Sequence, residues 1–260
     1  MKQFNGSEKN PVSISVVMPT RNSELTICKC LDALVLCKDV TEILIADGNS
    51  EDRTLALISE FDSAKVKVIS SRDKGLYDGV NKLIPYITGQ YVFFMNSDDI
   101  VNSDYVHSAV SVLGDRTYDY VFGDIVYDNF VRKPRFEAPP KTFRPFQLMP
   151  FPHVSLIMDA DLFRKVGGFD LRYKIAADLD YINRLMSLTN RGKYLPIIAA
   201  VCSPNGLSSG NEHVYEAWQV AVRHGRNPIA ASLTALAVYV YRCFFLPAKR
   251  MIRVRNCQIQ

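Results

Sequence analysis

The feature that most constrains the fold is a regular alternation of strand-like and helix-like segments in the first half of the chain. Five short apolar runs rich in β-formers lie at residues 14–18, 42–46, 65–70, 91–95 and 118–122. Between them, segments with the apolar spacing of helices lie at residues 24–36, 51–61, 76–87 and 104–113. This β-α-β alternation predicts an α/β fold with a mostly parallel sheet and helices on both faces.

The second half of the chain has a less regular pattern. Residues 131–152 contain six prolines and predict a long loop. Further strands are expected at 154–158 and 194–202, and further helices at 160–166, 178–188 and 211–224. Trp218 lies in the last of these helices at a spacing that favours core packing over stacking on a sugar.

Composition excludes several classes of protein. Among the 260 residues 48% are hydrophobic and 22% are charged, values typical of a globular protein and not of a disordered or fibrous chain. The six cysteines form no CxxC pair and no zinc-ligand spacing, so we expect reduced thiols. The polar first ten residues lack the apolar core of a signal peptide, which predicts a cytoplasmic protein.

Polar residues follow several of the expected strands. They form the groups Thr20-Arg21-Asn22, Asp47-Gly48-Asn49, Arg72-Asp73 and Asn96-Ser97-Asp98-Asp99. Ligands of parallel sheets bind at the carboxyl ends of the strands, so these groups predict a binding site. The adjacent acids of the last group repel each other unless a cation or hydrogen bonds offset their charge. One interpretation is a Mg²⁺ or Mn²⁺ site that shares a substrate's phosphates, and the alternative is that Ser97 or Asp98 caps the next helix.

Several segments, in the same order along the chain, resemble the family 2 glycosyltransferases, which have the nucleotide-sugar-binding GT-A fold. The segments are 16–22 (VVMPTRN), 47–54 (DGNSEDRT), 73–82 (DKGLYDGVNK), 95–99 (MNSDD), His153, 167–170 (GGFD) and 176–180 (AADLD). The third segment and the His153 region are most similar to bacterial enzymes that build O-antigen or capsule repeats. The resemblance implies a GT-A domain over residues 1–210, with a nucleotide-sugar-binding half at 12–125 and an acceptor half at 126–210.

The resemblance also implies roles on the donor side. Asp47 corresponds to the acid that contacts the nucleotide base, Thr20 and Asn22 to residues that line the same pocket, and Asp73 to the residue that closes it. Asn96 stands where the family's metal motif has its first acid, and an asparagine can still hydrogen-bond a ribose hydroxyl.

The metal and the catalytic base are implied in the same way. Asp98 and Asp99 correspond to the metal-binding end of the family's Asp-x-Asp motif, so Mn²⁺ or Mg²⁺ is the expected cofactor. Asp178 corresponds to the catalytic base. Its usual acidic neighbour is replaced by Ala177, so a supporting carboxylate has to come from elsewhere, for which Asp180 is a candidate.

Two of the candidate residues keep alternative assignments. Asp180 lies two positions beyond Asp178, so on a helix it points elsewhere and can instead bind an arginine or the backbone. His153 is a candidate for contact with phosphate or acceptor, and the alternative is a structural histidine that makes hydrogen bonds.

The function implied is an inverting, metal-dependent hexosyl transfer. One sugar would move from a nucleotide sugar, favoured as UDP-linked, to a hydroxyl of an undecaprenyl-diphosphate-linked saccharide in bacterial surface polysaccharide biosynthesis. The chain lacks the glycine-rich turns of dehydrogenases and P-loop kinases. A non-catalytic nucleotide-sugar-binding scaffold and a nucleotidyltransferase remain as alternatives, although the latter is expected to carry a glycine-rich loop after the first strand.

The segment 211–260 is expected to be a basic, helical tail. No acid follows Glu216, and residues 229–248 are apolar apart from a few polar positions that include Arg242. Seven basic residues occur in the tail: Arg223, Arg226, Arg242, Lys249, Arg250, Arg253 and Arg255. Aromatic and basic residues next to an apolar run indicate an amphipathic helix at an anionic membrane surface, here the inner face of the cell membrane. A core or dimer helix is the alternative, and nucleic acid is disfavoured as a partner.

Overall fold

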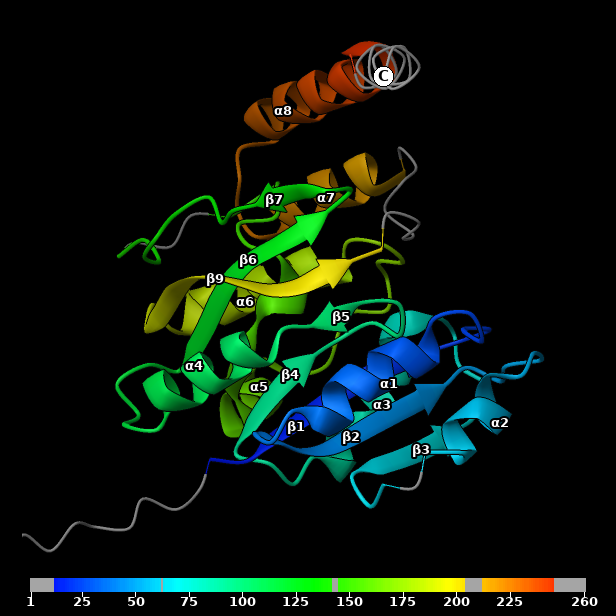
Figure 1. The fold of residues 1–260 in the computed structure, drawn as a ribbon. Coiled ribbons are helices and arrows are strands. Elements are labelled where there is room, and N and C mark those ends of the chain that lie inside the picture. Colours follow the sequence, from blue (N-terminus) through cyan, green and yellow to red (C-terminus); the bar gives the residue numbers. More distant parts are fainter. Residues whose placement is uncertain (1–11, 62, 142–144, 204–211, 246–260) are drawn as a thin grey trace, which may run out of the picture.

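A computed structural model describes residues 12–61, 63–141, 145–203 and 212–245 (Figure 1). Within these residues a nine-stranded sheet has the order β3-β2-β1-β4-β8-β6-β9-β5, and β7 pairs with β6. The strands are β1 (Ile14–Thr20), β2 (Val40–Asp47), β3 (Val66–Ser70), β4 (Tyr91–Phe94), β5 (Ile100–Val101), β6 (Tyr120–Tyr127), β7 (Phe130–Arg132), β8 (Ile157–Asp159) and β9 (Gly192–Cys202).

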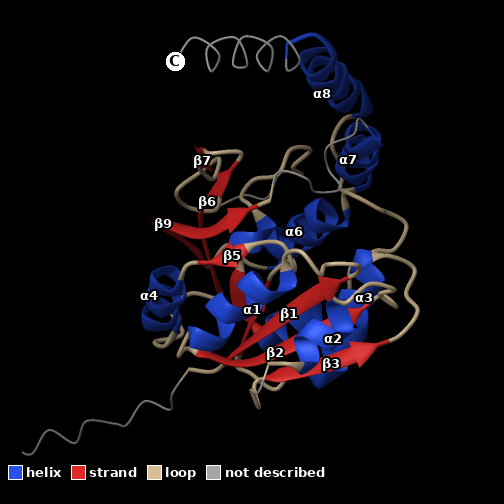
Figure 2. Cartoon of the chain, turned by 45° about the vertical axis from the view of Figure 1, so that its right-hand side comes forward, coloured by secondary structure: helices blue, strands red, loops and turns tan. Residues whose placement is uncertain are grey.

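The first four strands of this order, β3-β2-β1-β4, are all parallel, as Figure 2 shows for β1, β2 and β3. All seven residues of β1 are buried, because β1 has a strand on each side and helices on both faces. Val17 pairs with Leu44 of β2 and with Phe94 of β4. The expected α/β fold class is confirmed, and four of the five apolar runs form this parallel region, whereas the run at 118–122 overlaps β6 beyond the antiparallel β8.

The sheet becomes mixed beyond β4. β8 pairs antiparallel with both β4 and β6, β9 runs parallel to β6, and β5 runs antiparallel to β9. The sequence did not predict β5 or β7, because strands of two and three residues are too short to show an alternating pattern. The strand expected at 154–158 is shorter than predicted, since a 3₁₀ turn occupies His153–Ser155.

All helices except α8 pack against the two faces of the sheet. They are α1 (Ile27–Leu36), α2 (Thr54–Ser59), α3 (Leu76–Leu83), α4 (Ser103–Leu113), α5 (Ala160–Val166), α6 (Ala177–Leu188), α7 (Glu212–Arg223) and α8 (Pro228–Val240). One core forms beneath α1, α2 and α4 and includes Val16 and Met18 of β1. The other forms beneath α3, α5, α6 and α7 and includes Val17, because successive residues of a strand face opposite sides.

The start of α4 decides one of the open alternatives. Asn102 caps this helix, and its side chain accepts a hydrogen bond from the backbone N–H of Asp104. The strand β5 lies between the acidic group and the helix. The interpretation of Ser97 or Asp98 as a helix cap is therefore wrong, and the acids need another explanation.

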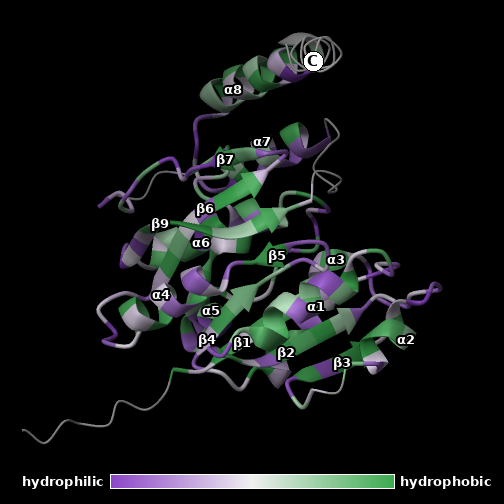
Figure 3. Cartoon of the chain, viewed as in Figure 1, coloured by the Kyte–Doolittle hydropathy of each residue, from purple (hydrophilic) through white to green (hydrophobic). Residues whose placement is uncertain are grey.

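The two C-terminal helices differ in how they are attached. α7 contributes Ala217 and Val220 to the core beneath the sheet, so this helix packs with the body. α8 lies at the periphery, beyond α7 (Figures 1 and 3), and Ala231 is its one buried residue. A buried glutamine, Gln147, donates a hydrogen bond of 2.9 Å to the carbonyl of Ala231. The division of the chain at residue 210 stays a prediction.

Trp218 does not lie in the core, contrary to expectation. It is half-buried between α7 and α8, where its ring stacks on Tyr215 and its Nε1 donates a hydrogen bond to Ser232. The basic residues from Lys249 onward lie outside the described residues. Within the part of the chain that the structure describes, no helix is both long and apolar enough to span a membrane.

Candidate active site

The carboxyl ends of β1 and β2 form one edge of the candidate site. Thr20 and Asp47, the last residues of these strands, are paired in register. The loops that follow are tied together by Asn22, whose backbone N–H donates to the Ser50 hydroxyl and whose side-chain oxygen accepts from the backbone N–H of Glu51, both at 2.9 Å. Asn22 has a φ of 49°, a left-handed conformation that asparagine tolerates better than most residues.

Asp47 is buried and fixes the turn after β2. Its carboxylate accepts hydrogen bonds from the Ser50 hydroxyl at 2.5 Å, the Ser50 backbone N–H and the Ser70 hydroxyl at 2.8 Å. Beside it, the buried hydroxyl of Thr20 has no hydrogen-bond partner among the described residues. A buried hydroxyl without a partner costs free energy, so this atom is suited to a polar group of a ligand.

Asp73 reaches the same edge from the loop before α3. A Cβ atom added at Gly48 would lie only 2.6 Å from Oδ2 of Asp73, so the glycine leaves the space that this carboxylate uses. The other oxygen of Asp73 accepts a hydrogen bond from the backbone N–H of Gly75. The structure thus places Thr20, Asn22, Asp47 and Asp73 at one edge of the sheet, and their roles in a nucleotide pocket stay a prediction.

The acids after β4 have two different environments. Asp99 is 2% exposed, and it accepts hydrogen bonds from the Asn96 amide at 2.9 Å and the Ser203 backbone N–H at 3.2 Å. Burial, and secondarily the charge of Asp98, raises the pKa of Asp99 above its ordinary value. Asp98 is half-exposed, and no described residue donates a hydrogen bond to its carboxylate.

This arrangement fits a divalent cation that shares its ligands with a substrate. The described residues contain no group of three or more histidines, cysteines or acids that would hold a metal by themselves. Mg²⁺ usually keeps several waters and binds through one or two carboxylates together with substrate phosphates. Asp98, with its free carboxylate, and the adjacent Asp99 are the residues that would serve as ligands.

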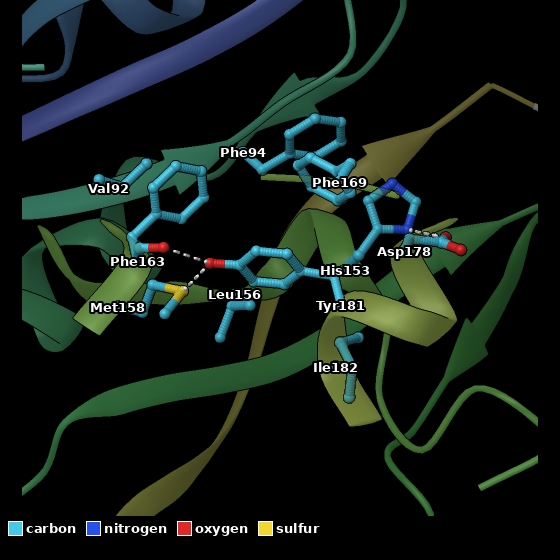
Figure 4. A pocket seen from close by; sticks show the side chains of 10 residues that line it. All are labelled: Val92, Phe94, His153, Leu156, Met158, Phe163, Phe169, Asp178, Tyr181 and Ile182. Carbon is cyan, nitrogen blue, oxygen red and sulfur yellow. Dashed lines mark hydrogen bonds and ion pairs between the residues drawn. The ribbon is translucent and has the colours of Figure 1, made fainter. Parts of the chain in front are cut away.

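Asp178 and His153 form an ion pair (Figure 4). Nδ1 of His153, in the 3₁₀ turn before β8, lies 2.9 Å from Oδ2 of Asp178, in the first turn of α6. Burial lowers the pKa of His153, but the charge and hydrogen bond of Asp178 and the charge of Asp99 together raise it above its ordinary value. A cavity of about 20 Å³ lies beside the pair and is lined mostly by apolar side chains such as Phe94 and Phe169.

Asp180 faces different partners. Its carboxylate lies 2.8 Å from Nε of Arg184 and 2.9 Å from Nε2 of His224, and it is buried. These contacts agree with the alternative assignment of Asp180 as an arginine partner. The acidic residue that supports the start of α6 is instead Glu216 of α7, which accepts hydrogen bonds from three successive backbone N–H groups at 174–176.

Sequence reasoning missed Glu216 and Tyr77. Tyr77 lies within the segment 73–82 that carries the family resemblance, and its hydroxyl donates a hydrogen bond of 2.8 Å to the carbonyl of Ile175. Its position in that segment was a signal that could have marked it. Glu216 lies in a helix far along the chain, and nothing in its neighbouring sequence indicates its contacts.

The chain is similar in sequence to known glycosyltransferases. The chain is 27% identical over 182 residues to a PGL/p-HBAD biosynthesis glycosyltransferase of Mycobacterium bovis, and the match covers 66% of this chain and 69% of the relative. It is 26% identical over 132 residues to the Escherichia coli protein named UDP-Glc:alpha-D-GlcNAc-diphosphoundecaprenol beta-1,3-glucosyltransferase WfgD, covering 49% of this chain and 52% of that protein.

A solved structure shares the fold. The crystal structure of S. aureus TarS 1–349 in complex with UDP-GlcNAc superposes with a TM-score of 0.69 at 21% sequence identity, covering 90% of this chain and 73% of that one. A sequence model of the family described as Glycosyl transferase family 2 matches residues 15–165, more than half of the chain. The chain therefore belongs to glycosyl transferase family 2 and is a glycosyltransferase.

Proposed function

We propose that this glycosyltransferase moves one sugar from a UDP-sugar to a hydroxyl of a lipid-linked saccharide, with inversion at the anomeric carbon and with the help of a divalent cation. The single observation that carries the proposal is the position of His153. Its Nδ1 lies 2.9 Å from Oδ2 of Asp178, and the charge of Asp99 also contributes to the raised pKa of the imidazole. This supports a single site that combines the candidate base with the candidate metal-binding acids.

The donor side supports a nucleoside diphosphate sugar. The edge formed by Thr20, Asn22, Asp47 and Asp73 lies at the carboxyl ends of parallel strands, where nucleotides bind in such sheets. The buried, unpartnered Thr20 hydroxyl is suited to a ligand contact at this edge. UDP is favoured over other nucleotides because the similar fold of TarS is described in complex with UDP-GlcNAc.

The acids after β4 support a cation at the leaving group. A bound Mn²⁺ or Mg²⁺ would supply positive charge that stabilises the developing charge on the departing diphosphate. Asp98 and Asp99 would hold it, while Asn96 fixes the Asp99 carboxylate through its amide. The neutral Asn96 side chain also avoids a third negative charge beside a carboxyl whose pKa is already raised.

The acceptor side supports a single displacement. Asp178 would accept the proton of the attacking hydroxyl, as a positioned carboxylate can. His153 would orient this carboxylate through the 2.9 Å contact. One in-line displacement inverts the anomeric carbon and needs a base but no covalent nucleophile. The acceptor class follows the name of the similar WfgD protein, which specifies GlcNAc-diphosphoundecaprenol.

A lipid-linked acceptor requires access to a membrane, and α8 has the exposed apolar surface that contact with a membrane needs. Three of its apolar residues are largely exposed: Ile229 (73%), Leu233 (64%) and Leu236 (60%). Figure 3 shows apolar residues along this outlying helix. The basic residues that follow, from Lys249 to Arg255, would attract anionic headgroups. We propose that the protein associates peripherally with the inner face of the cell membrane through this segment.

The deciding experiment is a panel of donors with one acceptor. UDP-glucose, UDP-galactose, UDP-N-acetylglucosamine and GDP-mannose are each offered with GlcNAc-diphosphoundecaprenol, with Mn²⁺ or with EDTA. We expect turnover of one UDP-sugar, dependent on the metal, and a product of inverted configuration. A scaffold would bind UDP and turn over none of the donors. A nucleotidyltransferase would also fail to transfer sugar in this panel, and in a separate assay with UTP and a sugar phosphate it would release pyrophosphate.

A further inference from the structure

The start of α6, which carries Asp178, is held by a carboxylate from another helix. Ala176, the residue before this helix, offers no side-chain cap, so the backbone N–H groups here need partners from elsewhere. Glu216 supplies them from α7: Oε1 accepts from Lys174 at 3.0 Å, and Oε2 accepts from Ile175 and Ala176, both at 2.8 Å. A carboxylate at this position also interacts favourably with the positive end of the helix dipole.

The opposite side of the same short segment is held by Tyr77. The hydroxyl of this α3 residue donates to the carbonyl of Ile175 at 2.8 Å. Burial and the nearby charge of Asp178 keep the pKa of Tyr77 well above its ordinary value, so the hydroxyl stays protonated and remains a donor. Residues 174–176 are thus held between α3, which carries Tyr77, and α7, which carries Glu216.

α7 is itself firmly attached around this segment. Arg223 lies 2.9 Å from Oδ2 of Asp170, and His224, directly after the helix, lies 2.9 Å from Asp180. Val220 of the same helix is fully buried. Together with Val220, the buried residues Val214, Ala217 and Ala221 pack α7 against the body, so this helix holds the Glu216 carboxylate beside the start of α6.

We propose that Glu216 is a positioning residue for catalysis: by accepting three backbone N–H groups at 174–176, it fixes the first turn of α6 and with it the Asp178 carboxylate. This inference rests on the proposed role of Asp178 as the base. The family-like segment has Ala177 where a supporting acid would stand, and Glu216 provides that acid from α7 through the backbone. A displacement of about 1 Å at a reacting group can cost about a hundredfold in rate, which gives this support a measurable role.

The test is a double-mutant cycle on the full-length protein. Turnover of the donor accepted in the panel above is measured with GlcNAc-diphosphoundecaprenol for the wild type, Glu216→Ala, Asp178→Asn and the double variant, together with UDP affinity by calorimetry. We expect Glu216→Ala to lower kcat about ten- to a hundredfold, with less than a twofold change in UDP affinity. In the Asp178→Asn background, Glu216→Ala should cost little more, because residues that act through one another are not additive.

Two further variants distinguish a specific effect on kcat from a general loss of folding. Glu216→Gln keeps the length and one acceptor oxygen, so it should lower kcat less than Glu216→Ala does. Tyr77→Phe removes the opposing hydrogen bond to Ile175, together with a hydroxyl that lies near Asp178, and should lower kcat in the same direction. The matched control is Glu212→Gln, an exposed acid on the same helix, which should leave turnover unchanged.

A readout that needs no turnover completes the test. Hydrogen exchange at the amides of residues 174–176 should be faster in Glu216→Ala than in the wild type. Unchanged exchange would overturn the proposed support of these residues by the Glu216 carboxylate. Full turnover of Glu216→Ala together with an inactive Asp178→Asn would overturn the positioning role alone, as would fully additive losses in the cycle. Full turnover of Asp178→Asn would instead overturn the proposed base.

Discussion

The side-chain amide of Asn96 donates a hydrogen bond of 2.9 Å to Oδ2 of Asp99. This contact explains how a carboxylate that is 2% exposed can lie beside another acid, Asp98. A third acid at position 96 would add repulsion where burial and Asp98 already raise the pKa of Asp99. The neutral amide instead holds the carboxylate in place and leaves the half-exposed Asp98 oriented by no described hydrogen bond.

The two acids should therefore respond differently to substitution. Asp98→Asn should lower turnover at least about a hundredfold, the scale of losing electrostatic stabilisation of a leaving group, and leave the melting temperature nearly unchanged. Asp99→Asn should lower both, since its partners Asn96 and the Ser203 backbone are arranged for a carboxylate. Steady-state kinetics with graded Mn²⁺ and thermal melts check this, and full activity of the wild type in EDTA would contradict the metal assignment.

Replacing the candidate base should separate chemistry from binding. Asp178→Asn keeps the shape of the side chain but removes the proton acceptor, so turnover should fall about a hundred- to ten-thousandfold. UDP affinity should barely change, because the nucleotide edge is formed by other strands. A lowered melting temperature with near-normal turnover, measured on one preparation, would show that Asp178 acts only in the structure of α6.

The pair of His153 and Asp178 predicts a pH dependence of stability. The folded-state pKa of His153 is raised above its ordinary value of 6.5, so the charged pair stabilises the fold fully below about 6.5. This contribution is lost as the pH rises through the raised folded-state pKa. Urea unfolding of the wild type and His153→Gln should therefore differ more at pH 5.5 than at pH 9, and a difference that grows with pH would refute the prediction.

Asp47 should affect the donor and not the chemical step. Its carboxylate fixes the turn through Ser50 and Ser70 and lies beside the Thr20 hydroxyl at the nucleotide edge. Asp47→Ala should raise the apparent KM for the donor and leave kcat nearly unchanged, as expected when binding is lost equally in the ground and transition states. Calorimetry with UDP and Mn²⁺ checks the affinity, and a variant that binds UDP as the wild type does would remove Asp47 from the pocket.

The exposed face of α8 should determine membrane binding. Replacing Leu233 and Leu236, which are 64% and 60% exposed, with serine removes apolar surface without opening the core. Sedimentation with anionic liposomes should fall, whereas UDP affinity should stay the same.

Replacing Lys249, Arg250, Arg253 and Arg255 with glutamine should weaken binding to anionic liposomes by about 1 kcal/mol per residue near the surface, and high salt should have a similar effect. Unchanged sedimentation of both variants would exclude this segment as the membrane contact.

The sequence alone determined the parallel part of the sheet and the grouping of polar residues at its carboxyl edge. Strands such as β1 and β4 are buried on both faces and therefore read as continuous apolar runs, and the polar residues at their ends must meet because parallel strands end at the same edge. Asp178 was assigned its role by resemblance alone, and the sequence also placed it at the start of a helix, where the structure has it. These features depend on local pattern and order along the chain, which a single sequence carries.

The helix cap of α4, the partners of Asp178 and the support of α6 depend on the tertiary structure, because these contacts join residues that are far apart in sequence. The cap of α4 by Asn102 depends on β5, a two-residue strand that exists only because it pairs with β9. The pairing of Asp178 with His153 of the 3₁₀ turn, and of Asp180 with His224 after α7, joins α6 to segments that are distant in sequence, whereas Arg184 reaches Asp180 from the next turn of α6 itself. The support that Glu216 gives to α6 has no sequence signal, since a carboxylate that accepts from backbone N–H groups is recognised only when the chain brings the two helices together.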